Sequence, residues 1–218
     1  GIVDVNGGSL IVEGSYRIET ENISEDGQKI YNQSSGRLKM SNPEDIVKVE
    51  GDFVTYSLYD HNGYFTEGVL EVKGNFTQRT TNSYNFYPTN NHKLILSGGS
   101  LQKVSLSTSS SRINILEIKN TSDEGVEFAS QVIVVGKLTN TSTHIKNGEN
   151  LHLQGNNLTD LEIWEYDISI SETHVLDKDI IIEGDLYLKG GTLDLNGHSL
   201  TVAGNLIHSN GILNVNGG

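Results

Sequence analysis

The chain has 218 residues and a formal net charge of −13, with 28 acidic and 15 basic residues. The basic residues are scattered, whereas a phosphate-binding surface needs clustered lysine and arginine, so nucleic acid is excluded as a partner. No apolar stretch approaches the roughly 20 residues that span a bilayer, and the absence of cysteine excludes disulfides and cysteine-based zinc sites.

The composition favours strands over helices. Only two alanines, Ala129 and Ala203, stand against 24 glycines and many asparagine, serine, threonine, valine and isoleucine residues. Alanine is the best helix former, while β-branched residues suit pleated, half-buried surfaces. We therefore expect an all-β protein of short strands joined by glycine and asparagine turns.

One seven-residue pattern recurs along the chain: apolar, any, apolar, any, glycine, polar, large apolar. Six copies begin at Leu10, Val47, Leu70, Val132, Ile180 and Leu200, and a shorter relative begins at Leu94. The alternation turns one face of a strand inward, and the glycine permits a bend or a positive φ before the next strand. The spacing of the copies predicts coils of roughly 20–25 residues, the size of one turn of a β-helix.

The pattern as a whole predicts a parallel β-helix, or β-solenoid, over a single domain of residues 1–218. The copies at Leu70 and Val132 are separated by a distance close to three such coils. Residues 23–33, 80–92, 105–112 and 140–150 are polar and predict loops that leave the coil. Residues 151–174 lack the pattern, which leaves divergent coils or a small inserted hairpin as alternatives.

A second motif contains asparagine before glycine. Residues 1–8 (GIVDVNGG) and 211–218 (GILNVNGG) match, and residues 191–198 (GTLDLNGH) are similar. The shared flanking residues predict that Asn6, Asn196 and Asn216 occupy equivalent corners, where stacked amides can hydrogen-bond along the axis. Alternatively, asparagine–glycine is simply a common turn dipeptide. The similarity of residues 1–8 and 211–218 favours one unit of a repeat array over a plain run of coils.

The segments GGTLDLNGHSLTVAGN at 190–205 and GILNVNGG at 211–218 resemble the right-handed β-helical repeats of bacterial surface proteins, such as filamentous-haemagglutinin-like adhesins and the stalks of large exported proteins. The resemblance implies a right-handed solenoid. The resemblance is clearest over residues 180–218 and 1–16. It implies a rigid, elongated element of a secreted or cell-surface protein, used for adhesion or display. It supplies no active-site residues.

Catalytic and metal sites are not expected. The acidic positions of the pattern (Glu13, Glu50, Glu71 and Glu183) point outward between inward apolar residues, and lysines such as Lys48 and Lys73 interleave with them as a solvated ladder. The seven histidines have no metal-ligand spacing and lie mostly in turns. We expect no cofactor, although residues 60–63 (DHNG) resemble the start of a calcium loop. The same residues can form the tip of a hairpin between Tyr59 and Tyr64.

Aromatic residues give the candidate ligand-binding site. Tyr59, Asp60 and Tyr64 form one group, and a polar loop holds a second group, Tyr84, Phe86 and Tyr87. Exposed aromatic faces beside asparagine and aspartate are suited to binding sugars. Alternatively, the loop aromatics pin the loop onto the solenoid.

Three functions follow from these observations. We favour a non-catalytic structural or adhesive solenoid segment that is extracellular. Its expected partners are neighbouring repeats of the same chain and a host or microbial surface glycan or protein. The alternative is a carbohydrate-binding module on a β-helix scaffold. The third possibility, a polysaccharide-cleaving enzyme, needs carboxylates on one face of adjacent coils.

Overall fold

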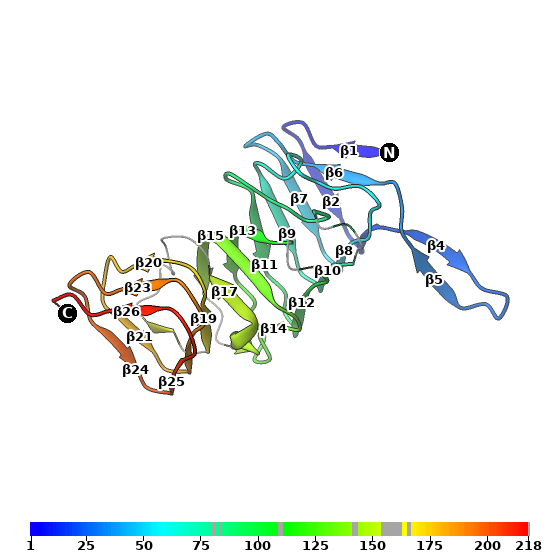
Figure 1. The fold of residues 1–218 in the computed structure, drawn as a ribbon. Coiled ribbons are helices and arrows are strands. Elements are labelled where there is room, and N and C mark those ends of the chain that lie inside the picture. The colour runs from blue at the N-terminus through cyan, green and yellow to red at the C-terminus, as the bar shows by residue number, and fades with distance from the viewer. Residues whose placement is uncertain are drawn as a thin grey trace.

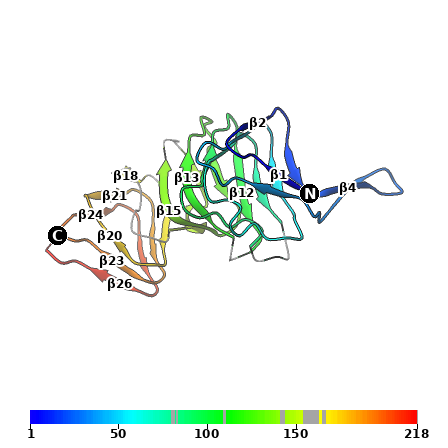
Figure 2. The ribbon, with the colours of Figure 1, turned by 90° about the horizontal axis from the view of Figure 1, so that it is seen from above.

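Short parallel strands stack coil upon coil in this chain, because each strand finds its hydrogen-bond partners in the coils before and after it. The computed structural model describes residues 1–79, 82, 84–108, 111–140, 144–153, 163–164 and 167–217. These residues form an all-β parallel β-solenoid, with the first and last coils at opposite ends (Figures 1 and 2). Their only helical element is the 3₁₀ turn η1 (Gly148–Asn150). The predicted fold class is confirmed.

Two large sheets form the sides of the solenoid. The ten-stranded sheet has the order β2 (Ser9–Val12), β7 (Ile46–Val49), β9 (Val69–Val72), β11 (Lys93–Leu96), β13 (Ile113–Ile118), β15 (Val132–Asn140), β17 (Leu151–Leu153), β19 (Ile168–Ile170), β22 (Leu186–Leu188), β25 (Leu206–His208). The six-stranded sheet has the order β16 (Ile145–Lys146), β14 (Val126–Phe128), β12 (Gln102–Leu106), β10 (Phe76–Gln78), β8 (Phe53–Thr55), β3 (Tyr16–Ile18).

Smaller sheets complete the coils. Two three-stranded sheets consist of β18 (Ile163–Trp164), β21 (Ile180–Ile182) and β24 (Leu200–Val202), and of β20 (His174–Val175), β23 (Thr192–Asp194) and β26 (Ile212–Asn214). A parallel pair consists of β1 (Ile2–Asp4) and β6 (Arg37–Lys39). The strands described within residues 151–174, namely β17 to β20, belong to the coils, as one of the two alternatives for this segment expected.

An antiparallel hairpin replaces the first predicted loop. Strands β4 (Thr20–Ile23) and β5 (Lys29–Asn32) pair over residues 20–32 and project away from the stack (Figures 1 and 2). Residues 23–33 therefore leave the coil as predicted, but they belong to a regular hairpin and not to an irregular loop. A turn around Gly27, whose φ is +80°, joins the two strands. The strands themselves are too polar to show the alternation of a half-buried strand.

The core follows the predicted inward positions in the first coils. Val47 pairs with Leu70 and Leu70 with Leu94, so these coils contain 23 and 24 residues. Leu94 then pairs with Leu116, and Leu116 with Leu138. All five side chains are fully buried and form one apolar column. The expectation that Val132 lies three coils above Leu70 was wrong, because Leu138 occupies that place.

Strand β15 explains this shift. Its second half pairs with β13 through Leu138, whereas its first half pairs with β17 through Val132. The chain does not turn at Gly136, as the pattern predicts, but continues as one strand of nine residues.

Beyond β15 the pattern lies on a different side of the solenoid. Residues 1–16 match residues 191–206, yet β2 lies in the ten-stranded sheet while its sequence equivalent β24 does not. In the last coil, β25, the equivalent of β3, occupies the ten-stranded sheet instead. Between the first and last coils, the seven-residue pattern therefore shifts from one side of the solenoid to the next.

The glycine of the pattern lies at a bend between two strands in five of the six copies, which is one of its two predicted roles. None of the pattern glycines has a positive φ; they allow the corners of successive coils to approach closely. A Cβ placed on Gly74 would lie 2.5 Å from the carbonyl carbon of Gly51, and a Cβ on Gly204 would lie 2.5 Å from the carbonyl oxygen of Gly184. The corner backbones are also joined by a hydrogen bond from the Gly74 amide to the Gly51 carbonyl oxygen, 2.9 Å long.

This close approach gives a matched pair of variants. Gly74→Ala is expected to lower the free energy of unfolding by about 1–3 kcal/mol, because the new methyl group overlaps backbone that cannot move aside. Gly14→Ala occupies the same position of the pattern, but a Cβ there meets no atom within 4 Å, so it should be neutral or slightly stabilising. Urea unfolding followed by circular dichroism measures both. Equal losses in the two variants would contradict close packing at the corner.

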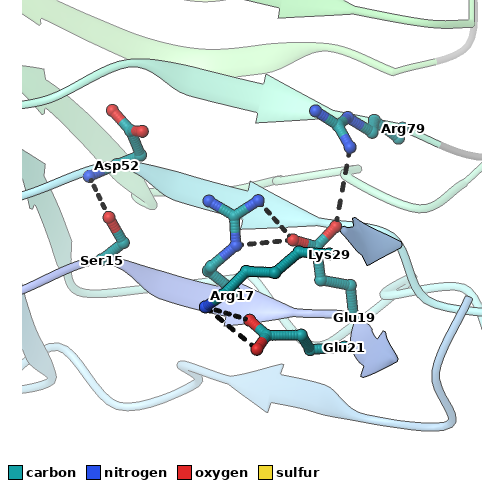
Figure 3. A network of polar contacts seen from close by, with 7 residues as sticks. All are labelled: Ser15, Arg17, Glu19, Glu21, Lys29, Asp52 and Arg79. Atoms are coloured by element: carbon teal, nitrogen blue, oxygen red, sulfur yellow. Dashed lines mark hydrogen bonds and ion pairs between the residues drawn. The ribbon is translucent and has the colours of Figure 1, made fainter. Parts of the chain in front are cut away.

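The polar position after each glycine forms a ladder along the corner. The Asp52 amide donates to Ser15 Oγ (3.0 Å), as Figure 3 shows, and the Asn75 amide donates to Asp52 Oδ1 (2.7 Å). The amide of Asn205 likewise donates to Asp185 Oδ1 (2.7 Å). Each side-chain oxygen therefore binds a backbone N–H of the next coil, which fixes the register at the corner.

The outward positions carry the predicted ladder of opposite charges. Lys48 lies 3.5 Å from Glu71, and Lys73 lies 2.7 Å from Glu50. These side chains come from neighbouring strands of the ten-stranded sheet and remain partly exposed, so each pair contributes little stability. The prediction of an outward ladder of alternating charge at these positions is confirmed.

Candidate functional site

Two loops on successive coils bring the predicted aromatic groups together. The His61 amide donates to the carbonyl oxygen of Tyr84 (3.0 Å), and buried Asn85 donates from Nδ2 to the carbonyl oxygen of Ser57 (2.8 Å). Asn85 Oδ1 also accepts from Thr55 Oγ1 (2.9 Å). The side-chain amide of Asn85 thus holds the two loops in register, and the tyrosines on the two loops lie next to one another.

Four tyrosines and two arginines form a surface over these loops, which we term the tyrosine–arginine surface. It consists of Tyr59, Tyr64, Tyr84, Tyr87, Arg37 and Arg112. The guanidinium of Arg37 lies 4.6 Å from the ring centroid of Tyr64 and 5.2 Å from that of Tyr59. The Arg112 guanidinium lies 3.9 Å from the ring centroid of Tyr87, which packs edge-on against Tyr84 at 4.7 Å. Cation–π contacts of this kind orient both the ring and the charge.

The surface is accessible. Tyr59 is 52% exposed and Tyr84 is 41% exposed, whereas Tyr64 and Tyr87 are half-buried. Partial burial lowers the pKa of Arg112, opposed by the nearby Tyr84. Asp60 is exposed beside the tyrosines, in a turn that ends with the Tyr64 amide donating to the carbonyl of His61 (2.9 Å).

The segment between Tyr59 and Tyr64 is not a hairpin. Ser57 and Phe65, on either side of the turn, form parallel bridges with Ser34 and Met40 of the preceding coil. The loop therefore belongs to a corner of the coil, where it stacks on the loop above. Among the described residues, no group of three or more histidine, aspartate or glutamate side chains lies close enough to hold a metal ion.

Phe86 lies in the core and not on the surface. Its ring is fully buried, 4.8 Å from the centroid of Phe76 and 5.0 Å from that of Phe65. Phe76 in turn stacks on Phe53 at 5.3 Å. Phe86 thus pins its loop onto the solenoid, which is the alternative that the sequence left open, and it presents no face to a ligand.

Two buried histidines lie under the same loops. His92 is 1% exposed, with its ring 5.1 Å from that of Phe65, and no hydrogen-bond partner among the described residues reaches either ring nitrogen. Burial lowers its pKa to about 3. His61 is also buried, accepts at Nε2 from the Leu38 amide (3.3 Å), and has its pKa lowered to about 4, mainly by burial. The expectation that these histidines lie in turns overlooked their burial, because sequence neighbours alone do not show which side a corner residue faces.

A second polar cluster lies at the base of the β4–β5 hairpin (Figure 3). The buried carboxylate of Glu19 lies 2.5 Å from Arg17 Nη2 and 3.8 Å from Arg79 Nη1. Arg17 also packs over the ring of Tyr31 at 4.5 Å, which attaches the hairpin to the solenoid. Sequence reasoning missed this cluster, since Arg79 reaches Glu19 from another coil, 60 positions away in the sequence.

A hollow of about 450 Å³ adjoins this cluster. Its lining includes Tyr16, Arg17, Glu19, Ser34 and Arg37. Arg37 therefore lines the hollow and also belongs to the tyrosine–arginine surface.

The predicted asparagine corners are found at turns. Asn6 and Asn196 both have positive φ, of 51° and 48°, and each precedes a glycine of positive φ. Asn196 Nδ2 donates to the carbonyl oxygen of Leu176 in the preceding coil (3.1 Å). Asn216 lies in a turn before Gly217, whose φ is 67°. An amide ladder through the three asparagines stays a prediction.

Comparison of the chain with protein-family models, curated proteins and solved structures finds no match. Among the described residues, no helix is long and apolar enough to cross a membrane. The fold and the surface described above therefore carry the functional argument alone.

Proposed function

We propose that this chain is a non-catalytic structural or adhesive β-solenoid segment of a large bacterial cell-surface or secreted protein, in the manner of a filamentous-haemagglutinin-like adhesin. The observation that carries this proposal is the tyrosine–arginine surface, where exposed tyrosines stand on loops that stacked coils hold in place. Pre-positioned aromatic side chains lose little conformational freedom on binding, so they suit a contact surface.

Carbohydrate binding is the second candidate, and the exposure of Tyr59 and Tyr84 favours it. Half-exposed tyrosine rings offer apolar faces beside hydrogen-bonding groups, as sugar-binding sites do. In this form of the proposal the partner is a host or microbial surface glycan, and the solenoid serves as its scaffold.

Neighbouring repeats are the other proposed partner. Strand β26 pairs with β23 in register, with Leu213 opposite Leu193 and Asn214 opposite Asp194. Strand β1 has the same sequence pattern as both, including Val3 and Asp4 at the corresponding positions. Strand β1 of a neighbouring repeat can therefore pair with β26 in the same register in which β26 pairs with β23.

Binding to a glycan array tests the contact surface. We expect the Tyr59→Ala Tyr84→Ala variant to lose binding by about tenfold, because each aromatic stacking contact contributes about 0.5–1.5 kcal/mol and about 1.4 kcal/mol corresponds to a factor of ten in affinity. Tyr187→Ala is the matched control, since Tyr187 is a partly exposed tyrosine that packs against Lys189 at 5.2 Å on a distant coil. Binding that survives the double substitution, or turnover of any bound glycan, would argue against the proposal.

A further inference from the structure

The charge of the tyrosine–arginine surface differs from that of the whole chain. Residues 33–38, 57–64, 84–92 and 111–114, which form the described part of the surface and its loops, contain two arginines and one aspartate, whereas the chain has 28 acidic and 15 basic residues. A local excess of positive charge on an acidic protein indicates a partner that is anionic.

The two arginines are also unusual in their pairing. Of the four arginines, Arg17 and Arg79 both face the carboxylate of Glu19. Arg37 and Arg112 have no carboxylate within 4 Å in the part of the chain that the structure describes, and no acceptor there reaches Arg37 Nε. Tyrosine rings hold both guanidiniums in place and leave their charge unpaired.

Arg37 and Arg112 lie on separate coils on either side of the tyrosine loops. Met40 bridges to Phe65, the Thr89 amide donates to the Phe65 carbonyl (2.8 Å), and the Arg112 amide donates to the Phe86 carbonyl (3.2 Å). These contacts place three coil steps between the two arginines, roughly 14 Å along the axis at the usual strand spacing. A ligand that contacts both must therefore be extended.

We propose that the tyrosine–arginine surface binds an anionic polysaccharide whose sugars carry carboxylates, with Arg37 and Arg112 as the anion-binding groups and Tyr59 and Tyr84 as stacking faces. The inference rests on the proposed function of this surface in adhesion and names its ligand class. A guanidinium binds a carboxylate through two parallel hydrogen bonds, and Arg37 lines the adjoining hollow. Asp60 opposes such a ligand by its charge.

Binding of soluble polygalacturonate, its fully methyl-esterified form and dextran sulfate, measured by calorimetry, tests the inference. We expect the wild-type chain to prefer polygalacturonate, with binding that weakens as salt is raised. The Arg37→Gln Arg112→Gln variant should bind at least about tenfold more weakly. Asp60→Asn should bind more tightly. Lys103→Gln, which removes one exposed positive charge paired with Glu127 at 3.1 Å, should bind as the wild type does.

The outcomes separate the two proposals. Equal binding of the acid and the ester, lost only in the tyrosine variant, would overturn the carboxylate inference and leave the adhesive surface in place. Preference for dextran sulfate would also overturn it, because the anion is then a sulfate. Failure to bind any glycan would overturn carbohydrate binding as well. Arg37→Lys Arg112→Lys, which keeps both charges, together with thermal melts of all variants, distinguishes lost binding from lost folding.

Discussion

Replacing Phe86 by alanine is expected to lower the free energy of unfolding by about 3–5 kcal/mol, the usual cost of removing a buried aromatic ring. The ring is fully buried against Phe76 and Phe65, so its removal leaves a cavity between two coils. The stacked coils cannot close that cavity, because their backbones are joined by strand hydrogen bonds on both sides.

The neighbouring Tyr84 is the control for this prediction. Its side chain is 41% exposed on the same loop, so Tyr84→Ala should change stability by less than about 1 kcal/mol. Urea unfolding followed by far-ultraviolet circular dichroism measures both variants. If Phe86→Ala and Tyr84→Ala cost the same, Phe86 does not anchor the loop.

The contrast between these two residues shows how far sequence reasoning extends. Tyr84, Phe86 and Tyr87 all lie in one polar loop without a repeating pattern, so nothing in their spacing tells which of them faces the core. Where the pattern is regular, as from Val47 to Leu70, alternation alone gives the inward face and the coil length. The fold was therefore predictable from the regular coils, whereas the orientation of loop side chains depends on contacts between coils.

The shift at β15 has a visible origin in the sequence. Ser15, Asp52, Asn75, Asp185 and Asn205 follow the glycine in five copies of the pattern, and each has a side-chain oxygen. In the sixth copy this residue is Lys137, which has no acceptor for a backbone N–H of the next coil. That copy is the one in which the glycine lies within a single strand, at a shift of the pairing register with β13. The sequence shows that Lys137 departs from the pattern. Its effect on the path of the chain can be understood only once the ladder of hydrogen bonds along the corner is known.

The arginines of the candidate surface were not predictable for a different reason. Arg37 and Arg112 are 75 positions apart in the sequence and contact tyrosines of other coils. The sequence indicated the tyrosines by their clustering along the chain. It could not show that two loops bring unpaired guanidiniums onto them, since this depends on which corners leave the coil on the same side.

Acid is expected to destabilise the solenoid through its buried histidines. In the folded chain burial lowers the pKa of His92 to about 3 and that of His61 to about 4, against about 6.5 for an unfolded histidine. Between the folded and the unfolded pKa values, the unfolded chain binds more protons than the folded chain. The free energy of unfolding therefore has its full value above about pH 6.5 and falls as the pH is lowered. The two histidines together should cost about 4 kcal/mol between pH 7 and pH 5.

Substitution of one histidine tests this assignment. His92→Leu removes a ring whose nitrogens have no partner among the described residues, so its side-chain contribution to the pH dependence disappears. Urea unfolding at pH 7, 6 and 5 should then show a loss over this range that is about 2 kcal/mol smaller than that of the wild-type chain. An unchanged slope in His92→Leu would show that His92 gains its proton in the folded state, and that the aromatic pocket around it opens to water before the coils separate.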